Sequence, residues 1–257
     1  MRIGHRSASR GNRRRDDRGF TLIELMIALL IGVFLLGALI TIVQANHAVF
    51  GDQNKMAQLQ DGERMAMTMM SDVIQSAGYY PAPYPPNNNT LTGSLIPAGV
   101  FVAGQSFYGT YSATPPGDQI SVRYMTASGD DVLNCSGQPN STGANVLYTN
   151  TFQVQQDASG NWQLTCTVNG TQYNLVSGVT NLSVLYGVKA NAGATGNSVD
   201  TYMNATQVNA LGLWSSVISA MVQLTFTNPL YAANQGQPQT MVIQRVISVM
   251  DQSGPIE

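Results

Sequence analysis

The sequence predicts an α+β fold in which one long N-terminal helix packs on an antiparallel β-sheet domain. An apolar segment, a proline-free amphipathic segment and many short alternating runs of residues support this prediction in the 257-residue chain. We expect four parts, namely a basic leader at residues 1–19, the apolar half of the helix at 20–43, its amphipathic half at 44–78, and a β-rich globular domain at 79–257.

The apolar segment is long enough to cross a membrane. From Phe20 to Val43 it has 24 residues, of which only Glu24 is charged. A helix of that length extends roughly 36 Å, compared with about 30 Å for the hydrocarbon core of a bilayer. Because a carboxylate in such a segment is costly, Glu24 is a candidate functional residue that requires a partner.

The leader before this segment is strongly basic. It holds seven arginines and two aspartates. Basic flanks stay on the cytoplasmic side, so we expect a single-pass membrane protein with its N-terminus inside the cell and its bulk outside. The apolar run is too long for a conventional secretory signal, and no Ala-x-Ala cleavage site follows it. A plain signal anchor with an incidental glutamate is the alternative.

The helix is expected to continue beyond the membrane as an amphipathic segment. Residues 44–77 contain no proline, and apolar residues recur there at three- and four-residue spacing while charged residues occupy the other faces. Gly78 is the expected end, since four prolines follow between residues 81 and 86. The buried stripe is predicted to comprise Met56, Leu59, Ala66, Met70, Val73, Ile74 and Ala77.

From residue 87 onward the composition changes to Gly, Ser, Thr and Asn with short alternating runs, which are typical of half-buried strands. Asp157 to Gly160, between two such runs, predicts a hairpin turn. Loops are expected at residues 87–114, 190–206 and 229–239. The predicted strands are Ile120–Tyr124, Leu164–Val168, Leu182–Val188, Val222–Phe226 and Thr240–Asp251.

Both cysteines, Cys135 and Cys166, lie in the part of the chain expected outside the cytoplasm. Oxidising conditions there favour a disulfide, which would close a loop of about 30 residues and stabilise the fold by roughly 3 to 4 kcal/mol. Neither cysteine has a neighbouring His or Cys that a catalytic or metal-binding thiol would need. We therefore predict that they pair.

Residues 18–25, Arg-Gly-Phe-Thr-Leu-Ile-Glu-Leu, resemble the class III signal of type IV prepilins and of type II secretion pseudopilins. The resemblance implies a pilin fold, cleavage between Gly19 and Phe20 by a prepilin peptidase, and N-methylation of Phe20. It also makes Glu24 the assembly carboxylate, which would meet the α-amino group of Phe20 in a neighbouring subunit. Two unit charges about 4 Å apart interact by about 4 kcal/mol at an effective dielectric constant near 20.

A second stretch narrows the subfamily. Residues 178–188, 199–202, 213–214 and 217–224 resemble the C-terminal pattern of PilW-type minor pilins, a group related to the J pseudopilin of type II secretion. The resemblance implies a low-abundance subunit that works with other minor pilins, the major pilin and the inner-membrane assembly platform. Such a subunit would start filament assembly or form the filament tip, and would support twitching motility, adhesion or DNA uptake. A J-type secretion pseudopilin and a tip adhesin are the alternatives.

Charge and composition argue against nucleic-acid binding and against catalysis. Removal of residues 1–19 leaves five basic and 12 acidic residues, a formal charge of −7 without a basic cluster. The remaining chain has one histidine, no phosphate-binding loop and no metal-ligand cluster, so no enzyme, cofactor or metal site is expected. Asp130, Asp131 and Asp157 are interpreted as turn residues rather than calcium ligands. The adhesin alternative would use Tyr79, Tyr80, Tyr84, Tyr108 and Tyr111.

Overall fold

The protein was analysed as a computed structural model, which describes residues 19, 21–81, 91–96, 99–189, 198–233 and 236–250. Backbone contacts divide the chain into two compact units, residues 1–52 and 53–257. Helix α1, Leu22–Gln75, contributes its first part to one unit and its last part to the other. Apart from Gly19, the basic leader lies outside the described residues.

Helix α1 is continuous over 54 residues, as the absence of proline predicts. It ends at Gln75, three residues before the expected end, because the chain turns through residues 76–78. Gly78 adopts a φ of 80°, a left-handed conformation that glycine accepts without strain. Its N–H donates to the carbonyl of Arg123 at 3.1 Å, and Met125 N–H donates to the carbonyl of Tyr79 at 2.8 Å, so strand β4 holds the chain where it leaves the helix.

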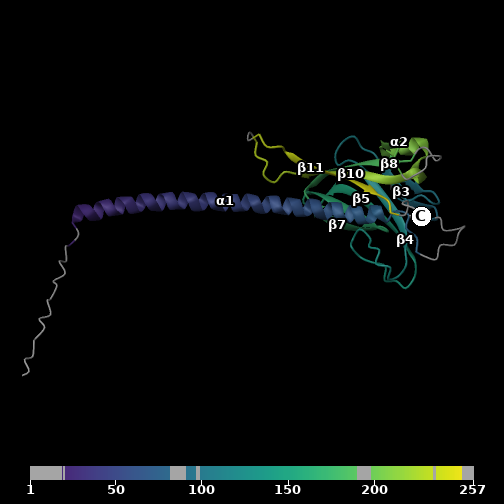
Figure 1. Cartoon of the computed structure of the whole chain (residues 1–257), viewed down its shortest axis with the longest axis horizontal. Helices are drawn as coiled ribbons and strands as arrows, with labels where there is room; N and C mark the ends of the chain where they lie inside the picture. The colour runs from purple at the N-terminus through teal and green to yellow at the C-terminus, as the bar shows by residue number, and fades with distance from the viewer. Residues whose placement is uncertain are drawn as a thin grey trace, which may run out of the picture. The chain divides into compact units, whose positions relative to one another are not determined.

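The second unit contains two antiparallel sheets, and Figure 1 shows the last turns of α1 running alongside their strands. One sheet is a five-stranded meander in the order β3-β4-β5-β6-β7, and the other has the order β11-β10-β8-β9. A small hairpin, β1-β2, and two short helices complete the unit. The bounds are β1 Ser94–Ile96, β2 Gly99–Phe101, β3 Phe107–Thr110, β4 Gln119–Thr126, β5 Val146–Gln156, β6 Trp162–Val168, β7 Thr171–Ser177, β8 Val179–Val188, β9 Thr201–Met203, α2 Ala205–Leu211, the 3-10 helix Trp214–Ser216, β10 Val217–Thr227 and β11 Thr240–Ser248.

The α+β architecture and the predicted strands are confirmed, whereas two of the predicted loops are wrong. Residues 87–114 include β1, β2 and β3, and residues 190–206 include β9 and the start of α2. Strands of three or four residues are too short to show alternation, so tertiary pairing rather than local pattern forms them. The hairpin turn at Asp157 is confirmed, with Gly160 N–H donating to the Asp157 carbonyl at 3.0 Å.

The core lies between the two sheets and the last part of α1. The helix contributes Ala66, Met67, Met70, Val73 and Ile74, which are buried together with the inward-facing residues of both sheets. Met56 and Leu59, predicted members of the stripe, are only half-buried, and Met67, which is not among the seven predicted members, is fully buried. Helix α1 already lies close to strand β7 at Gly62, where an added Cβ would be 3.2 Å from Cγ1 of Val176.

Arg123 in β4 is fully buried and organises the segment before it. Its Nε donates to the Gln105 carbonyl at 2.5 Å, and its Nη2 donates to the Val102 carbonyl at 2.6 Å. Its Nη1 donates to the Thr92 carbonyl, and the guanidinium lies 4.5 Å from the Phe101 ring centroid. Burial lowers the pKa of Arg123 to about 10. Backbone carbonyls thus take the place of a counterion and fix Thr92, Val102 and Gln105 against β4.

Asp118 joins the two sheets. The carboxylate, which is 5% exposed, accepts hydrogen bonds from Ser112 N–H and from Val184 N–H, each at 2.8 Å. Its own N–H donates to the Leu182 carbonyl at 2.7 Å. Burial raises the pKa of the Asp118 carboxyl above its ordinary value of 3.8, and the two backbone hydrogen bonds oppose that shift.

Replacing Arg123 by methionine is expected to lower the free energy of unfolding by about 3 kcal/mol, because several buried carbonyls lose their donor. Arg123→Lys should recover only part of this, since an ammonium cannot reproduce the planar fork. Denaturant unfolding of the detergent-solubilised chain measures both changes. Arg64→Met, at an exposed position of α1, is the control and should be nearly neutral. Equal losses of stability for Arg123→Met and Arg64→Met would contradict the stabilising role of the hydrogen bonds from Arg123.

Asp118→Asn is expected to destabilise the chain by about 1 to 3 kcal/mol, because an amide NH₂ would face one of two N–H donors. The raised pKa of Asp118 also makes the stability of the fold depend on pH. Since the folded pKa of Asp118 is raised above the unfolded value, its contribution to stability is present below about pH 3.8 and is lost as the pH rises through the folded pKa. Unfolding measured across this range should show a falling slope that Asp118→Asn removes.

Candidate processing and assembly site

The first part of α1 exposes apolar side chains around its whole circumference. All described side chains from residue 22 to residue 43 are exposed, including Leu22 at 77% and Phe34 at 78%. By length and composition, α1 is the one helix in the described part of the chain that could cross a membrane. Such a surface requires lipid, or the apolar segments of other subunits, around it.

Glu24 lies in the first turn of α1, where it forms a reciprocal capping box with Thr21. Thr21 N–H and the Thr21 hydroxyl donate to Glu24 Oε2 at 3.4 and 3.2 Å, and Glu24 N–H donates to Thr21 Oγ1 at 3.4 Å. The carboxylate also lies at the positive end of the helix dipole. Glu24 therefore has a local partner within its own subunit. The spacing Thr-x-x-Glu before an apolar run signals this cap in the sequence, but our sequence reasoning missed it.

Gly19 and Phe20 precede the cap. Gly19 is exposed, and nothing lies within 4 Å of the position that a Cβ would take there. Phe20 lies outside the described residues. The predicted scissile bond before Phe20 leaves Thr21 N–H intact, so cleavage there would preserve the capping box.

Cys135 and Cys166 form a disulfide with their Cα atoms 6.3 Å apart. Cys166 lies in β6, and Cys135 lies in the connection between β4 and β5, where its N–H donates to Asn150 Oδ1 at 2.9 Å. Both side chains are buried in the core. Among the residues that the structure describes, no group of three or more His, Cys, Asp or Glu could hold a metal ion.

The acidic residues of the loops support turns. Asp130 accepts hydrogen bonds from Ala127 N–H and Val132 N–H, at 2.8 and 3.1 Å. Asp157 accepts from Ser159 N–H and Asn161 N–H, both at 2.8 Å. Hydrogen bonds, chiefly from Asn161, lower the pKa of Asp157. These contacts agree with the interpretation of both residues as turn residues.

The five tyrosines of the adhesin alternative occupy different environments. Tyr108 stacks on Trp214 with ring centroids 5.4 Å apart, and Tyr79 packs against the core. Tyr111 is 46% exposed, whereas Tyr84 lies outside the described residues. Packing therefore accounts for at least Tyr79 and Tyr108.

Two family matches fit this geometry. The prokaryotic N-terminal methylation motif matches residues 14–40, and the family Type IV Pilus-assembly protein W matches residues 140–252, from before β5 to beyond β11. Together the two matches support a PilW-type minor pilin of a type IV pilus. The exposed apolar helix with its motif fits a membrane-anchored pilin. No curated protein and no solved structure is significantly similar to the chain.

The two matches confirm the resemblance found in the sequence. Pilin families are structural subunits, and a pilus-assembly protein interacts with other pilus components. The two matches cover the two ends of the chain, and residues 41–139 lie between them. That intervening stretch includes Arg123, Asp118 and Cys135 of the disulfide.

Replacing Cys135 and Cys166 together by serine is expected to lower the free energy of unfolding by roughly 3 to 4 kcal/mol, since the sequence separation is 31 residues. Denaturant unfolding of the oxidised chain and of the double variant measures the difference. The unmodified chain under reducing conditions is the control and should match the double variant. A variant as stable as the oxidised chain would contradict the expected contribution.

Proposed function

We propose that this PilW-type minor pilin starts filament assembly and forms part of the tip complex with other minor pilins. The observation that carries the proposal is one carboxylate, Glu24, in the first turn of an exposed apolar helix that bears the methylation motif. Other minor pilins, the major pilin, the prepilin peptidase and the inner-membrane assembly platform are the proposed partners. Twitching motility, adhesion or DNA uptake would depend on the resulting filament.

Processing and topology are part of this proposal. The prepilin peptidase would cut between Gly19 and Phe20 and methylate the new amine of Phe20. Before assembly, residues 1–19 would be cytoplasmic and residues 79–257 periplasmic, in accordance with the seven arginines of the leader. After assembly, the chain would lie in the pilus at the cell surface.

Glu24 would act both in the free subunit and in the assembled filament. In the described part of the chain, only Oε2 of Glu24 accepts a hydrogen bond, and both donors are groups of Thr21. A carboxylate has about four lone-pair positions, so Oε1 can accept the Phe20 amine of a neighbour without loss of the cap. A subunit out of register would leave that amine unpaired in apolar surroundings, which is unfavourable. The carboxylate would therefore set the axial position of subunits.

A secretion pseudopilin and a tip adhesin make different predictions for a deletion strain. Loss of surface filaments and twitching supports the minor pilin. Blocked release of exoproteins with normal pili supports a J-type pseudopilin, and intact filaments with lost attachment support an adhesin.

Substitutions at Glu24 separate its charge from its role in the cap. Glu24→Gln retains an acceptor for Thr21 but loses the charge, whereas Glu24→Ala loses both. If the neighbour's amine requires a carboxylate, the amount of each variant in sheared filaments should fall at least about tenfold, because a contact of more than 1.4 kcal/mol is lost. Both variants should remain in the inner-membrane fraction. Immunoblots of the two fractions measure this.

Thr21→Ser is the control, because serine preserves the cap, and it should be incorporated normally. Normal incorporation of Glu24→Gln together with loss of Glu24→Ala would reduce Glu24 to a capping residue. Normal incorporation of both would overturn the assembly role.

A further inference from the structure

Strand β11 is an unusual sheet edge. Natural sheets protect their end strands by making them short, bulged, charged or proline-containing. In the two larger sheets of the described chain, β9 has three residues, β3 has four, and β7 pairs with a register shift. Strand β11 has nine residues, contains no proline and pairs with β10 in one continuous register. Its outer edge is thus long and straight.

The backbone groups on this edge can be assigned from the register. Val249 N–H donates to the Ile218 carbonyl at 3.0 Å, so alternate N–H groups, at residues 247, 245, 243 and 241, point toward β10. The intervening N–H groups point away from the sheet. Within the described chain, none of those outward groups has a hydrogen-bond partner, and they belong to Val242, Gln244, Val246 and Ser248.

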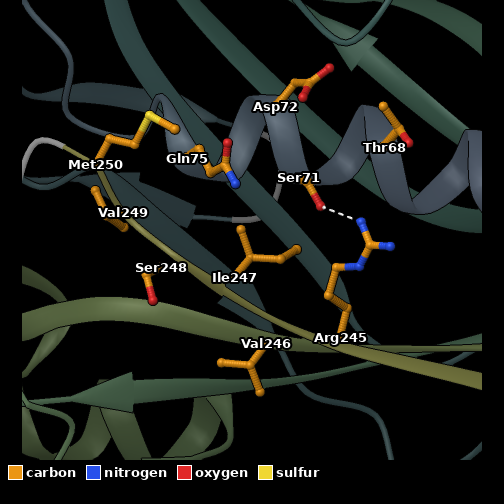
Figure 2. Close-up of a pocket in the computed structure, with 10 residues that line it drawn as sticks. All are labelled: Thr68, Ser71, Asp72, Gln75, Arg245, Val246, Ile247, Ser248, Val249 and Met250. Atoms are coloured by element: carbon orange, nitrogen blue, oxygen red, sulfur yellow. Dashed lines mark hydrogen bonds between the residues drawn. The ribbon is translucent and has the colours of Figure 1, made fainter.

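At the C-terminal end of β11 the outward direction is toward helix α1. Met250, the next residue in the outward series, donates its N–H to the Gln75 carbonyl at 3.0 Å. This bond closes one end of a groove of about 580 Å³ between α1 and residues 245–250. Thr68, Ser71, Asp72 and Gln75 line the helical wall, and Ile247 is buried beneath (Figure 2).

The groove is lined by the Asp72 carboxylate and by one cation, Arg245. Its Nη1 donates to Ser71 Oγ at 3.4 Å, and Asp72 points away from it (Figure 2). In the part of the chain that the structure describes, no carboxylate forms an ion pair with Arg245. An apolar strand added here would bury the guanidinium without a counterion, whereas a strand carrying an Asp or Glu would pair with it.

We propose that the outer edge of β11 binds one extended, carboxylate-bearing segment of another pilus subunit, which adds as a strand in the groove beside α1. Backbone hydrogen bonds to the four outward residues would supply affinity, and Arg245 would supply selectivity. The inference rests on the proposed assembly with other minor pilins for the identity of the partner. A second copy of this chain fits poorly, because its own β11 has α1 alongside, and antiparallel self-pairing centred near Arg245 would bring two guanidinium groups together.

Photo-cross-linking tests this contact in cells that make the complete pilus machinery. A benzophenone amino acid replaces Ser248, at the rim of the groove, and in a matched control it replaces the exposed Gln172 of edge strand β7. The expected result is an adduct between the Ser248 position and another pilus subunit, with none from the Gln172 position. An adduct only within the same chain, only with a second copy, or with no pilus subunit would overturn the proposal.

Substitutions in β11 identify which of its groups bind the partner strand. Val246→Pro removes one outward N–H and no bond to β10, so the adduct should fall by about tenfold while the thermal midpoint of unfolding is unchanged. Val246→Thr keeps the N–H and is the control. Arg245→Glu should also abolish the adduct, and Arg245→Lys should retain part of it. If Val246→Pro lowers the thermal midpoint, Arg245→Glu decides, and its failure to reduce the adduct would overturn the proposal.

The two proposals can fail separately. Filaments of normal number in the deletion strain would reject the assembly role whatever the cross-linking result. Filaments that require this chain but are unaffected by both Val246→Pro and Arg245→Glu, with the adduct unchanged, would reject only the docking edge.

Discussion

Helix α1 is one continuous helix whose first part is exposed and apolar and whose last part packs in the protein core. The rest of the fold depends on this difference. The first part of α1 is apolar on every side, so no single face can be covered by the chain itself, and lipid or neighbouring subunits must cover it. Its last part has one buried stripe, from Ala66 to Ile74, and the two sheets cover that stripe. The helix is stable in the absence of proline, and the chain leaves it only where Gly78 accepts a left-handed conformation.

The second recurring feature is the use of backbone groups as partners for buried charges. The Arg123 guanidinium is held by carbonyls and by the Phe101 ring, and the Asp118 carboxylate is held by N–H groups of two separate segments. Each charge therefore fixes the path of the chain rather than pairing with another side chain. This arrangement suits a domain with few ionisable residues, because each charge can organise a long stretch of polar, weakly patterned sequence. In such stretches local propensity specifies little, and one multiply bonded side chain can supply the missing specificity.

The sequence predicts those features that depend on composition and period over many residues. The apolar segment, the amphipathic helix, the long alternating strands and the Cys135–Cys166 pair are examples, since each leaves a local or compartmental signal. It does not predict β1, β2, β3 and β9, because three or four residues carry no period and their pairing depends on distant chain. Nor does it reveal that Arg123 is buried, since a lone arginine in an alternating run resembles any surface cation. The Thr-x-x-Glu spacing in the sequence was sufficient to predict the cap between Thr21 and Glu24, but only the charge of Glu24 was considered.

The capping box changes how the energetics of Glu24 should be understood. A carboxylate with no partner in the isolated subunit would gain all of its stabilisation on assembly, and the subunit would be strongly driven to associate. A carboxylate already bonded through Oε2 to Thr21 and located at the positive helix end is tolerated before assembly, so the additional gain from a neighbour's amine is smaller. Its contribution then lies more in selecting one axial register than in overall affinity. We expect the affinity to come from the apolar surface of α1 and from contacts of the globular domain, where the outward N–H groups of β11 lack a hydrogen-bond partner among the described residues and Arg245 borders the groove beside them.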